Sequence, residues 1–157
     1  MIQRPPISTI LTNQSIPHSV FRHLASVNSL EQAAAERGQT PDQIVRSILF
    51  RLEQTQFVMV LVAGPGQISW RTLRQQLGQS RITTATPEEV LAVTGYPIGA
   101  VAPFGLCQPL PILVDESVTK QEELSIGSGV RGTAIILRTA DLLRALGDVT
   151  IGNFKAA

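Results

Sequence analysis

Two features of this 157-residue sequence could hold a negatively charged group. Arg46 stands in a β-rich run, where alternate residues share a face, and its face is otherwise apolar, with Ile48, Phe50 and Leu52. A half-buried guanidinium needs a partner, which is either a group of the protein, as in an ion pair, or a ligand. The segment 95–105 contains three glycines and two prolines. Glycine lets a backbone approach a ligand closely and present several N–H donors, although an ordinary crossover loop explains the segment equally well.

A second glycine-rich segment, Gly127-Ser-Gly-Val-Arg-Gly132, matches the GxGxxG pattern of dinucleotide-binding sites. That chemistry requires a helix directly after the glycines, so that a phosphate lies at the helix N-terminus. The residues that follow, 133–137, are β-rich and have no helix cap. The pattern therefore favours a turn between two strands, and a nucleotide-binding protein is the less favoured alternative.

Side chains that serve as nucleophiles or metal ligands are scarce in the sequence. There is no GxSxG nucleophile elbow, and the one cysteine, Cys107, has no histidine nearby, so we expect a small buried residue at that position. The two histidines, His18 and His23, lack the spacing of a zinc site. We expect neither a metal nor a cofactor.

The net charge of the chain is only +1, but the charge is unevenly distributed. The segment 37–81 contains six arginines and two acidic residues, which gives it a net charge of +4. Guanidinium groups pair with phosphate in a bidentate fork, so this segment is a candidate nucleic-acid footprint, and an ordinary solvated face is the alternative. The longest apolar run, residues 57–63, is far shorter than the roughly 20 residues that span a bilayer. Because the N-terminus also lacks a signal peptide, we expect a cytoplasmic protein without membrane contact.

Local patterns predict the elements that position these residues. Residues 44–52 and 57–63 form the two strands of a predicted hairpin. Helix caps are predicted at Ser29, Thr40, Ser69, Thr86 and Thr139. Further strands are predicted at 20–23, 81–85, 112–115, 123–126, 133–138 and near 149–151. This order predicts an α+β fold with a mixed or largely antiparallel sheet, a loose arm over residues 1–15 and a single domain over residues 16–157.

Four runs of residues, taken in this order and spacing, resemble the YbaK/prolyl-tRNA-synthetase-associated editing domains. The runs are Gly38-Gln-Thr-Pro-Asp-Gln-Ile-Val-Arg46-Ser-Ile-Leu, Leu91-Ala-Val-Thr-Gly95-Tyr-Pro-Ile-Gly-Ala-Val-Ala-Pro-Phe-Gly105, Leu110-Pro-Ile-Leu-Val-Asp115-Glu-Ser and Ile126-Gly-Ser-Gly129. The resemblance covers residues 16–152, and it rests on the whole set because no single run is specific.

The resemblance implies a compact α+β fold with a curved mixed sheet flanked by helices, and it implies hydrolysis of the ester of a mischarged aminoacyl-tRNA. The acceptor end of that tRNA would be the partner, and an aminoacyl-tRNA synthetase is a second candidate partner. Because the sequence contains no synthetase body, we expect the activity in trans. In the family, the attack by water is assisted by groups of the substrate itself, without a metal.

The resemblance also implies site residues. The GxxxP loop of the family, which forms part of the amino-acid pocket, corresponds to Gly99-Ala-Val-Ala-Pro103. Backbone N–H groups of such a loop can stabilise the oxyanion of ester hydrolysis. The predicted catalytic residues are Arg46 and Gly99. The predicted substrate-binding residues are His23, Ala100, Val101, Ala102, Pro103, Asp115, Gly127 and Gly129, with Asp115 expected to cap or orient the loop and not to react.

Two positions differ from the pattern of the family. Arg46 stands where the family has a lysine, and arginine keeps the charge but cannot act as a base because its pKa exceeds about 12. Thr133 and Ala134 stand where many members have Asp or His. The alternative to a deacylase is therefore a catalytically inactive module of the same fold, which binds a tRNA end or an aminoacyl group.

Overall fold

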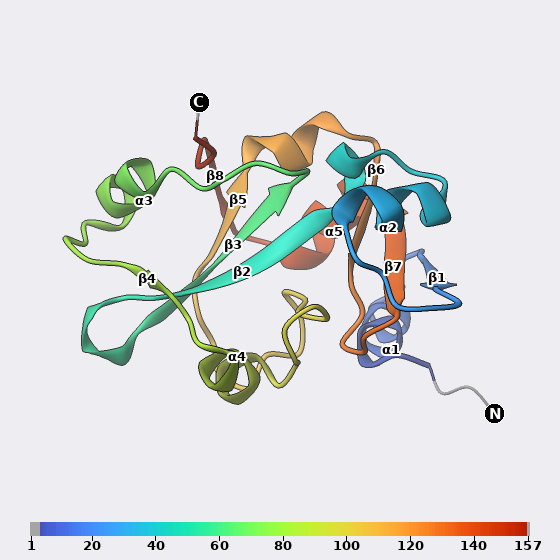
Figure 1. The fold of residues 1–157 in the computed structure, drawn as a ribbon. Helices are drawn as coiled ribbons and strands as arrows, with labels where there is room; N and C mark the ends of the chain where they lie inside the picture. The colour runs from blue at the N-terminus through green and yellow to red at the C-terminus, as the bar shows by residue number, and fades with distance from the viewer. Residues whose placement is uncertain (1–3, 157) are drawn as a thin grey trace.

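Two β-sheets form the centre of the molecule, and helices and long loops surround them (Figure 1). The computed structural model describes residues 4–156. One sheet has the strand order β1-β7-β6, and the other has the order β4-β2-β3-β5-β8. The strands are β1 (Ser19–Arg22), β2 (Val45–Arg51), β3 (Phe57–Ala63), β4 (Thr83–Thr84), β5 (Ile112–Asp115), β6 (Glu123–Gly127), β7 (Thr133–Arg138) and β8 (Thr150–Gly152). The helices are α1 (Pro6–Asn13), α2 (Leu30–Arg37), α3 (Trp70–Leu77), α4 (Pro87–Thr94) and α5 (Thr139–Leu146), with short 3-10 helices at Pro41–Gln43, Glu53–Thr55 and Glu116–Lys120.

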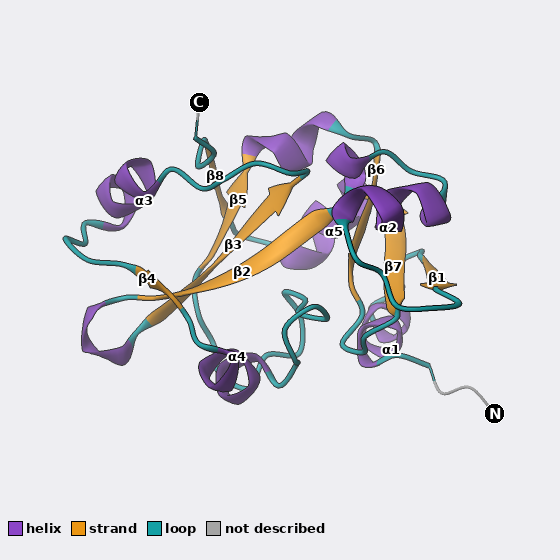
Figure 2. Cartoon of the chain, in the orientation of Figure 1, coloured by secondary structure: helices purple, strands orange, loops and turns teal. Residues whose placement is uncertain are grey.

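The α+β fold and the mixed pairing of its strands are confirmed, but the strands divide into two sheets instead of one. β2 runs antiparallel to β3 and β4, whereas β5 runs parallel to β3 and β8 runs parallel to β5. Ile44, the residue before β2, forms one parallel bridge with Ser125 of β6, and the two strands then diverge (Figure 2). Because no further pairs follow this single bridge, β2 and β6 belong to different sheets.

The predicted hairpin positions Arg46. β2 and β3 pair over seven residues, starting from Val45 opposite Ala63. Every residue of β3 after the first is buried, as expected for an apolar run that is covered on both faces. Met59 on one face and Val60 on the other belong to two different core clusters, so the hairpin is fixed from both sides.

Several helix ends follow the predicted caps. The Ser69 side chain accepts the Thr72 N–H at the start of α3, and Thr86 exchanges both bonds of a capping box with Glu89 at the start of α4. Thr139 is the first residue of α5 and not its cap, because its hydroxyl donates to the carbonyl of a residue before β6. Within residues 4–156, no helix has the length and apolar character needed to cross a bilayer.

The N-terminal segment is part of the core, so the predicted loose arm is wrong for the residues after 3; residues 1–3 lie outside the described part of the chain. Pro6 occupies the first turn of α1, where its missing N–H costs nothing, and this is why two prolines did not prevent a helix. Ile7 and Leu11 of α1 are fully buried. The Ile7 N–H also donates to the Ser128 carbonyl (3.2 Å), which ties α1 to the turn between β6 and β7.

We predict that Leu11→Ala lowers the free energy of unfolding by about 2–5 kcal/mol, because it leaves a cavity in the core. Thr9→Ala, on the exposed face of the same helix, should change it by less than about 0.5 kcal/mol. Urea denaturation of both variants checks this, and an unchanged midpoint for Leu11→Ala would show that α1 does not contribute to the core.

Candidate functional site

A cavity of about 580 Å³ lies between β2, α2, the loop after α4 and the turn that joins β6 to β7. Four of the predicted site residues line it, namely Arg46, Gly99, Val101 and Gly127. They come from three separate parts of the chain, so the tertiary structure brings them together. The cavity lies where β2 and β6 diverge, and its presence therefore follows from the division of the sheet.

The lining of this cavity is positively charged. It contains two arginines, Arg37 and Arg46, and no acidic side chain from residues 4–156. Much of the remaining wall is apolar and includes Leu49, Val90 and Ile126. A cationic cavity with apolar walls suits a ligand that joins an anionic group to a small apolar one.

Arg46 is held by backbone carbonyl groups. Its Nε donates to the Gly64 carbonyl (3.1 Å) and its Nη2 to the Gly66 carbonyl (2.5 Å). None of the ion pairs among the described residues includes Arg46, so the ion pair considered as its alternative is not formed. Burial lowers the pKa of Arg46, since desolvation disfavours the charged form, but an arginine in a protein stays protonated. These two bonds use two of the five N–H donors, which leaves charge and donors for a ligand.

Arg37 lines the same cavity, although its position in the sequence marks it only as the last residue of a helix. Its Nε donates to Nε2 of His23 (3.1 Å) and its Nη1 to Oγ of Ser125 (2.9 Å). Burial lowers the pKa of Arg37, and the charge of Glu36 partly offsets this effect. No local pattern could identify Arg37 as a site residue, because its contacts with β6 join residues far apart in the chain.

His23 does not line the cavity but holds Arg37 in place. Its side chain is only 2% exposed, and its Nδ1 lies 2.8 Å from Oε1 of Glu36. Because Nε2 accepts a hydrogen bond from Arg37, the network assigns the proton of a neutral imidazole to Nδ1. The hydrogen bond from His23, followed by that from Gln32, lowers the pKa of Glu36. His23 was expected to bind substrate, but it contacts Arg37 from outside the cavity.

Two glycines hold the loop 99–103 against the turn between β6 and β7. The Gly129 N–H donates to the Ala100 carbonyl (2.9 Å). Gly127 lies so close to the loop that a Cβ at this position would be 2.1 Å from the carbonyl oxygen of Val101. No larger residue fits there without moving the loop, which accounts for this glycine.

The loop itself divides into lining residues and buried residues. Gly99 and Val101 line the cavity, whereas Ala100, Ala102 and Pro103 are buried and do not. Gly99 has a φ of 93°, a conformation that favours glycine. The nearest atom to a Cβ at Gly99 would be Nε of Arg131, at 3.8 Å, so the space beside this residue is open.

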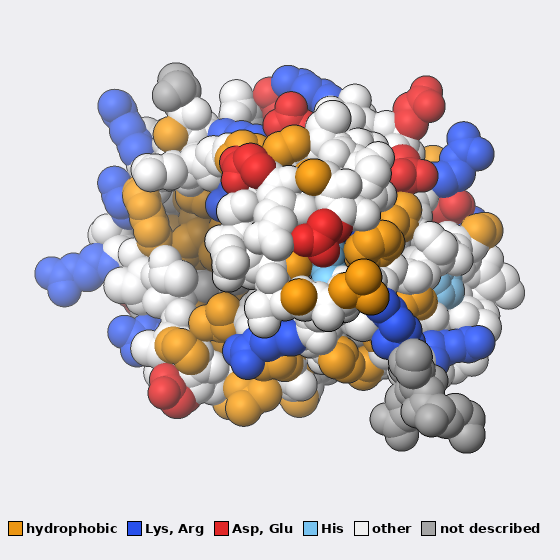
Figure 3. All heavy atoms as spheres, turned by 45° about the vertical axis from the view of Figure 1, so that its right-hand side comes forward, with side chains coloured by type: hydrophobic (Ala, Val, Ile, Leu, Met, Phe, Trp, Pro, Cys, Tyr) orange, Lys and Arg blue, Asp and Glu red, His pale blue; other side chains and the backbone are white. Residues whose placement is uncertain are grey.

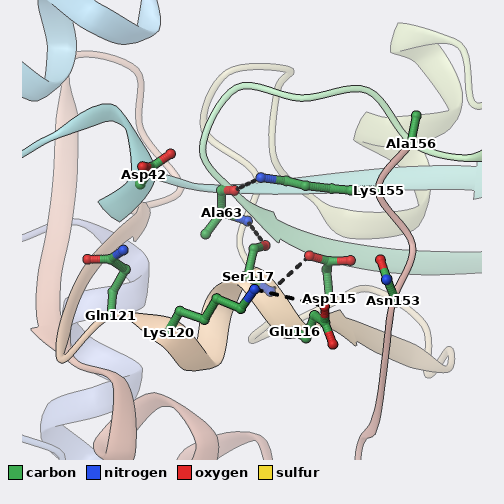
Figure 4. A pocket seen from close by; sticks show the side chains of 10 residues that line it. All are labelled: Asp42, Ala63, Asp115, Glu116, Ser117, Lys120, Gln121, Asn153, Lys155 and Ala156. Atoms are coloured by element: carbon green, nitrogen blue, oxygen red, sulfur yellow. Dashed lines mark hydrogen bonds and ion pairs between the residues drawn. The ribbon is translucent and has the colours of Figure 1, made fainter.

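Asp115 lies at a second cavity, of about 410 Å³, and not at the first one (Figure 4). Its carboxylate accepts the N–H groups of Ser117 (2.9 Å) and Phe154 (2.6 Å), and it thereby joins the end of β5 to the C-terminal segment. Burial raises the pKa of Asp115, but these hydrogen bonds and the charge of Lys155 outweigh it, so the net pKa is lowered. Asp115 therefore caps the 3-10 helix Glu116–Lys120, and it does not line the cavity of Arg46 and Gly99, where a substrate-binding residue was expected.

Cys107 lies in the loop that follows α4, and Thr133 is the first residue of β7. Cys107 is exposed, so the prediction of a buried cysteine is wrong; the loop that follows α4 carries it along the surface. Thr133 lines the first cavity. Its hydroxyl forms hydrogen bonds with the Ser128 hydroxyl and the Val130 carbonyl, so it belongs to the turn.

Comparisons with known proteins identify a family and relatives of similar sequence and fold. The family described as aminoacyl-tRNA editing domain matches residues 25–145. A multifunctional Ser/Thr-tRNA deacylase, ProXp-y, from Escherichia coli strain K12 is 27% identical over 150 residues, which cover 93% of this chain and 89% of the relative.

Two other similarities concern prolyl-tRNA synthetases. A proline–tRNA ligase from Kosmotoga olearia is 33% identical over 106 residues, which cover 68% of this chain but only 18% of the ligase. A crystal structure described as that of a candidate trans-editing enzyme for prolyl-tRNA synthetase superposes with a TM-score of 0.86 and 28% identity, over 96% of this chain and 95% of the other.

For Asp115→Asn we predict a loss of about 1.5–3 kcal/mol of unfolding free energy at about pH 7, because one of the two N–H donors loses its charged acceptor. The folded-state pKa of Asp115 is lowered, so its carboxylate stabilises the fold above its unfolded pKa of about 4 and ceases to do so as the pH falls through the folded value. The difference between wild type and variant should therefore shrink on acidification. Denaturant titrations across this range measure it, with exposed Asp148→Asn as the control; a difference independent of pH would contradict the assignment.

Proposed function

Because the chain belongs to the aminoacyl-tRNA editing domain family, we propose that it hydrolyses the ester bond of mischarged aminoacyl-tRNA and acts in trans. The observation that carries this proposal is the cavity that combines two arginines, no acidic side chain of the described residues and a glycine loop. The Escherichia coli relative named as a Ser/Thr-tRNA deacylase supports the reaction class and makes seryl- and threonyl-tRNA the first substrates to test.

The reaction divides into steps that the cavity can support. The oxygen of water bonds to the carbonyl carbon of the ester, and the bond from that carbon to the ribose oxygen breaks. The ribose oxygen takes up a proton, and the amino acid leaves as a carboxylate. The intermediate carries an oxyanion, which main-chain N–H groups beside the cavity would stabilise.

The proton of the attacking water needs an acceptor. Arg46 and Arg37 stay protonated, and the described lining contains no Asp, Glu, His, Cys or Lys. We therefore assign the proton transfer to groups of the substrate itself, as the resemblance to the editing domains implies. The contribution of the protein is then position and electrostatic stabilisation.

The two arginines are assigned to the phosphates of the acceptor end, which lie close to the ester. Both arginines donate to neutral acceptors, which leave their charge in place. The carboxylate of Glu36, which contacts His23, offsets part of the charge of Arg37. On the face shown in Figure 3, Lys and Arg side chains are spread around the rim and form no continuous patch. The net charge of +1 favours recognition of the acceptor end over a long tract of tRNA.

We predict that Arg46→Ala lowers kcat/KM for mischarged tRNA by about 10- to 150-fold, because a charge-assisted hydrogen bond to phosphate is lost. Arg46→Lys should retain much of the activity, since it keeps the charge. Initial hydrolysis rates and melting curves of the three proteins measure this. The salt dependence of tRNA binding should also weaken, by about 0.7–0.9 in the slope of log K against log salt for one lost phosphate contact.

The matched control for Arg46 is Arg71→Ala, which removes the same charge from an exposed position on α3 outside the cavity. A stable Arg46→Ala protein with full turnover would exclude Arg46 from the mechanism. If Arg46→Ala only lowers the melting temperature, the residue merely supports the 64–66 loop. A wild-type protein that protects charged tRNA stoichiometrically and never turns it over is the binding module, and the hydrolase proposal then fails.

Gly99→Val should abolish hydrolysis while the fold is kept, because a branched side chain would occupy the open space beside the loop and strain a positive φ. Gly147→Val is the control, since Gly147 also has a positive φ and open surroundings but lies outside the cavity. Circular dichroism and the hydrolysis assay decide the outcome, and normal turnover of folded Gly99→Val would remove the loop from the site.

A further inference from the structure

β2 has an edge without a partner strand where it borders the cavity. β4 pairs with β2 only at Phe50 and Arg51, and at the other end β6 meets it only at the bridge between Ile44 and Ser125. Between these two points no strand within residues 4–156 pairs with this edge of β2, and residues 45–49 line the cavity. An open strand edge presents N–H and C=O groups that are ready to pair with an added segment.

The register shows which residue directs its backbone groups into the cavity. The Met59 N–H donates to the Pro111 carbonyl (3.0 Å), so Met59 bonds toward β5 and its pair with Leu49 is one without hydrogen bonds across the hairpin. In agreement, the Leu49 carbonyl accepts the Ala85 N–H (3.0 Å) on the side of β4. Backbone direction repeats every second residue, so the N–H and C=O of Ser47 also point away from β3, toward the cavity.

The burial of Ser47 agrees with this direction. The residue is partly exposed, but its Oγ is buried and has no hydrogen-bond partner among the described residues. The exposed atoms of Ser47 are therefore its main chain and Cβ. No described group satisfies the two backbone groups of Ser47 on the cavity side.

We propose that Ser47 binds the aminoacyl group by its main chain, as a one-residue addition to the edge of β2. An aminoacyl ester has an α-amino donor and a carbonyl acceptor in the same arrangement as one strand residue, and opposed residues of an antiparallel pair can exchange two hydrogen bonds. The α-amino group donates to the Ser47 carbonyl, and the ester carbonyl accepts the Ser47 N–H. This inference rests on the proposed function. It specifies the substrate as an ester whose α-carbon carries a hydrogen-bond donor.

The pairing also places the reacting atoms. Directly opposed residues put their side chains on the same face, so the substrate side chain lies on the face of Val45 and Leu49, both of which are buried. Val101 packs against the core clusters that contain these two residues, so the loop of Gly99 covers this face. As water adds to the ester, the negative charge develops on the oxygen that the Ser47 N–H already contacts, which makes Ser47 a catalytic residue through its backbone.

Substrates that differ at the α-position test the proposal with the wild-type protein. The same tRNA is charged with alanyl, lactyl and propionyl groups, and each rate is divided by the uncatalysed rate of that ester, since the α-substituent changes its reactivity. The normalised kcat/KM should fall roughly 10- to 100-fold from alanyl to propionyl, which lacks a donor, and lactyl should lie nearer to alanyl. Ser47→Pro removes the Ser47 N–H and should lose turnover. The hydrogen bonds between β2 and β3 do not use this N–H, so the substitution removes no bond of that ladder.

Hydrogen exchange of backbone amides gives a readout that needs neither turnover nor a variant. A non-hydrolysable adenosine that carries alanine through a 3′-amide should slow exchange at the Ser47 N–H at least roughly tenfold, and much less at Ile48, whose N–H already pairs with β3. Hydrolysis with equal normalised rates for alanyl and propionyl esters and no protection of Ser47 overturns the pairing and leaves the hydrolase standing. Protection of Ser47 without turnover of any charged tRNA supports the pairing and refutes the hydrolase.

Discussion

The single bridge between Ile44 and Ser125 determines the architecture of this molecule. If β2 and β6 stayed paired beyond it, the strands would form one continuous sheet with no space between them. Because they diverge, the edge of β2 stays open, α2 and the loop after α4 border the gap, and a cavity of about 580 Å³ results. An open edge is a liability for aggregation unless it is short or covered, and here it is both limited to a few residues and enclosed by a helix and a loop.

The same gap governs the electrostatics of the site. A buried cation is stable when its donors find acceptors, and acidic acceptors would also neutralise it. Arg46 donates to the carbonyls of Gly64 and Gly66, and Arg37 donates to an imidazole and a hydroxyl, so each guanidinium is anchored by neutral acceptors and keeps its charge and further N–H donors. The acidic residue of this network, Glu36, contacts His23, and none of the ion pairs among the described residues joins it to Arg37. The groups that fix the positions of the two arginines are thus neutral, and this arrangement suits a cavity for an anionic ligand.

Patterns that are local in the sequence predicted most of the fold. The hairpin of β2 and β3, the cap of α3 at Ser69 and the turn of Gly127 depend on neighbours within a few residues, and all three are confirmed. Properties that depend on contacts between distant segments were not predictable in this way. The division into two sheets, the burial of α1 and the place of Arg37 beside the cavity are of this kind, because each arises only when segments far apart in the chain meet.

The arginine at position 46 fixes the position of a positive charge as well as supplying it. An ammonium group is a compact charge on a flexible stem and can turn toward a ligand, whereas a guanidinium is a rigid planar fork. Here that fork spans two carbonyls on either side of Pro65, so it braces the loop that follows β3 while it lines the cavity. A lysine in the same place has no planar fork to reach both carbonyls in this fixed geometry. Arginine therefore provides a positive charge whose position is set before any ligand arrives, at the expense of the freedom to move with the ligand.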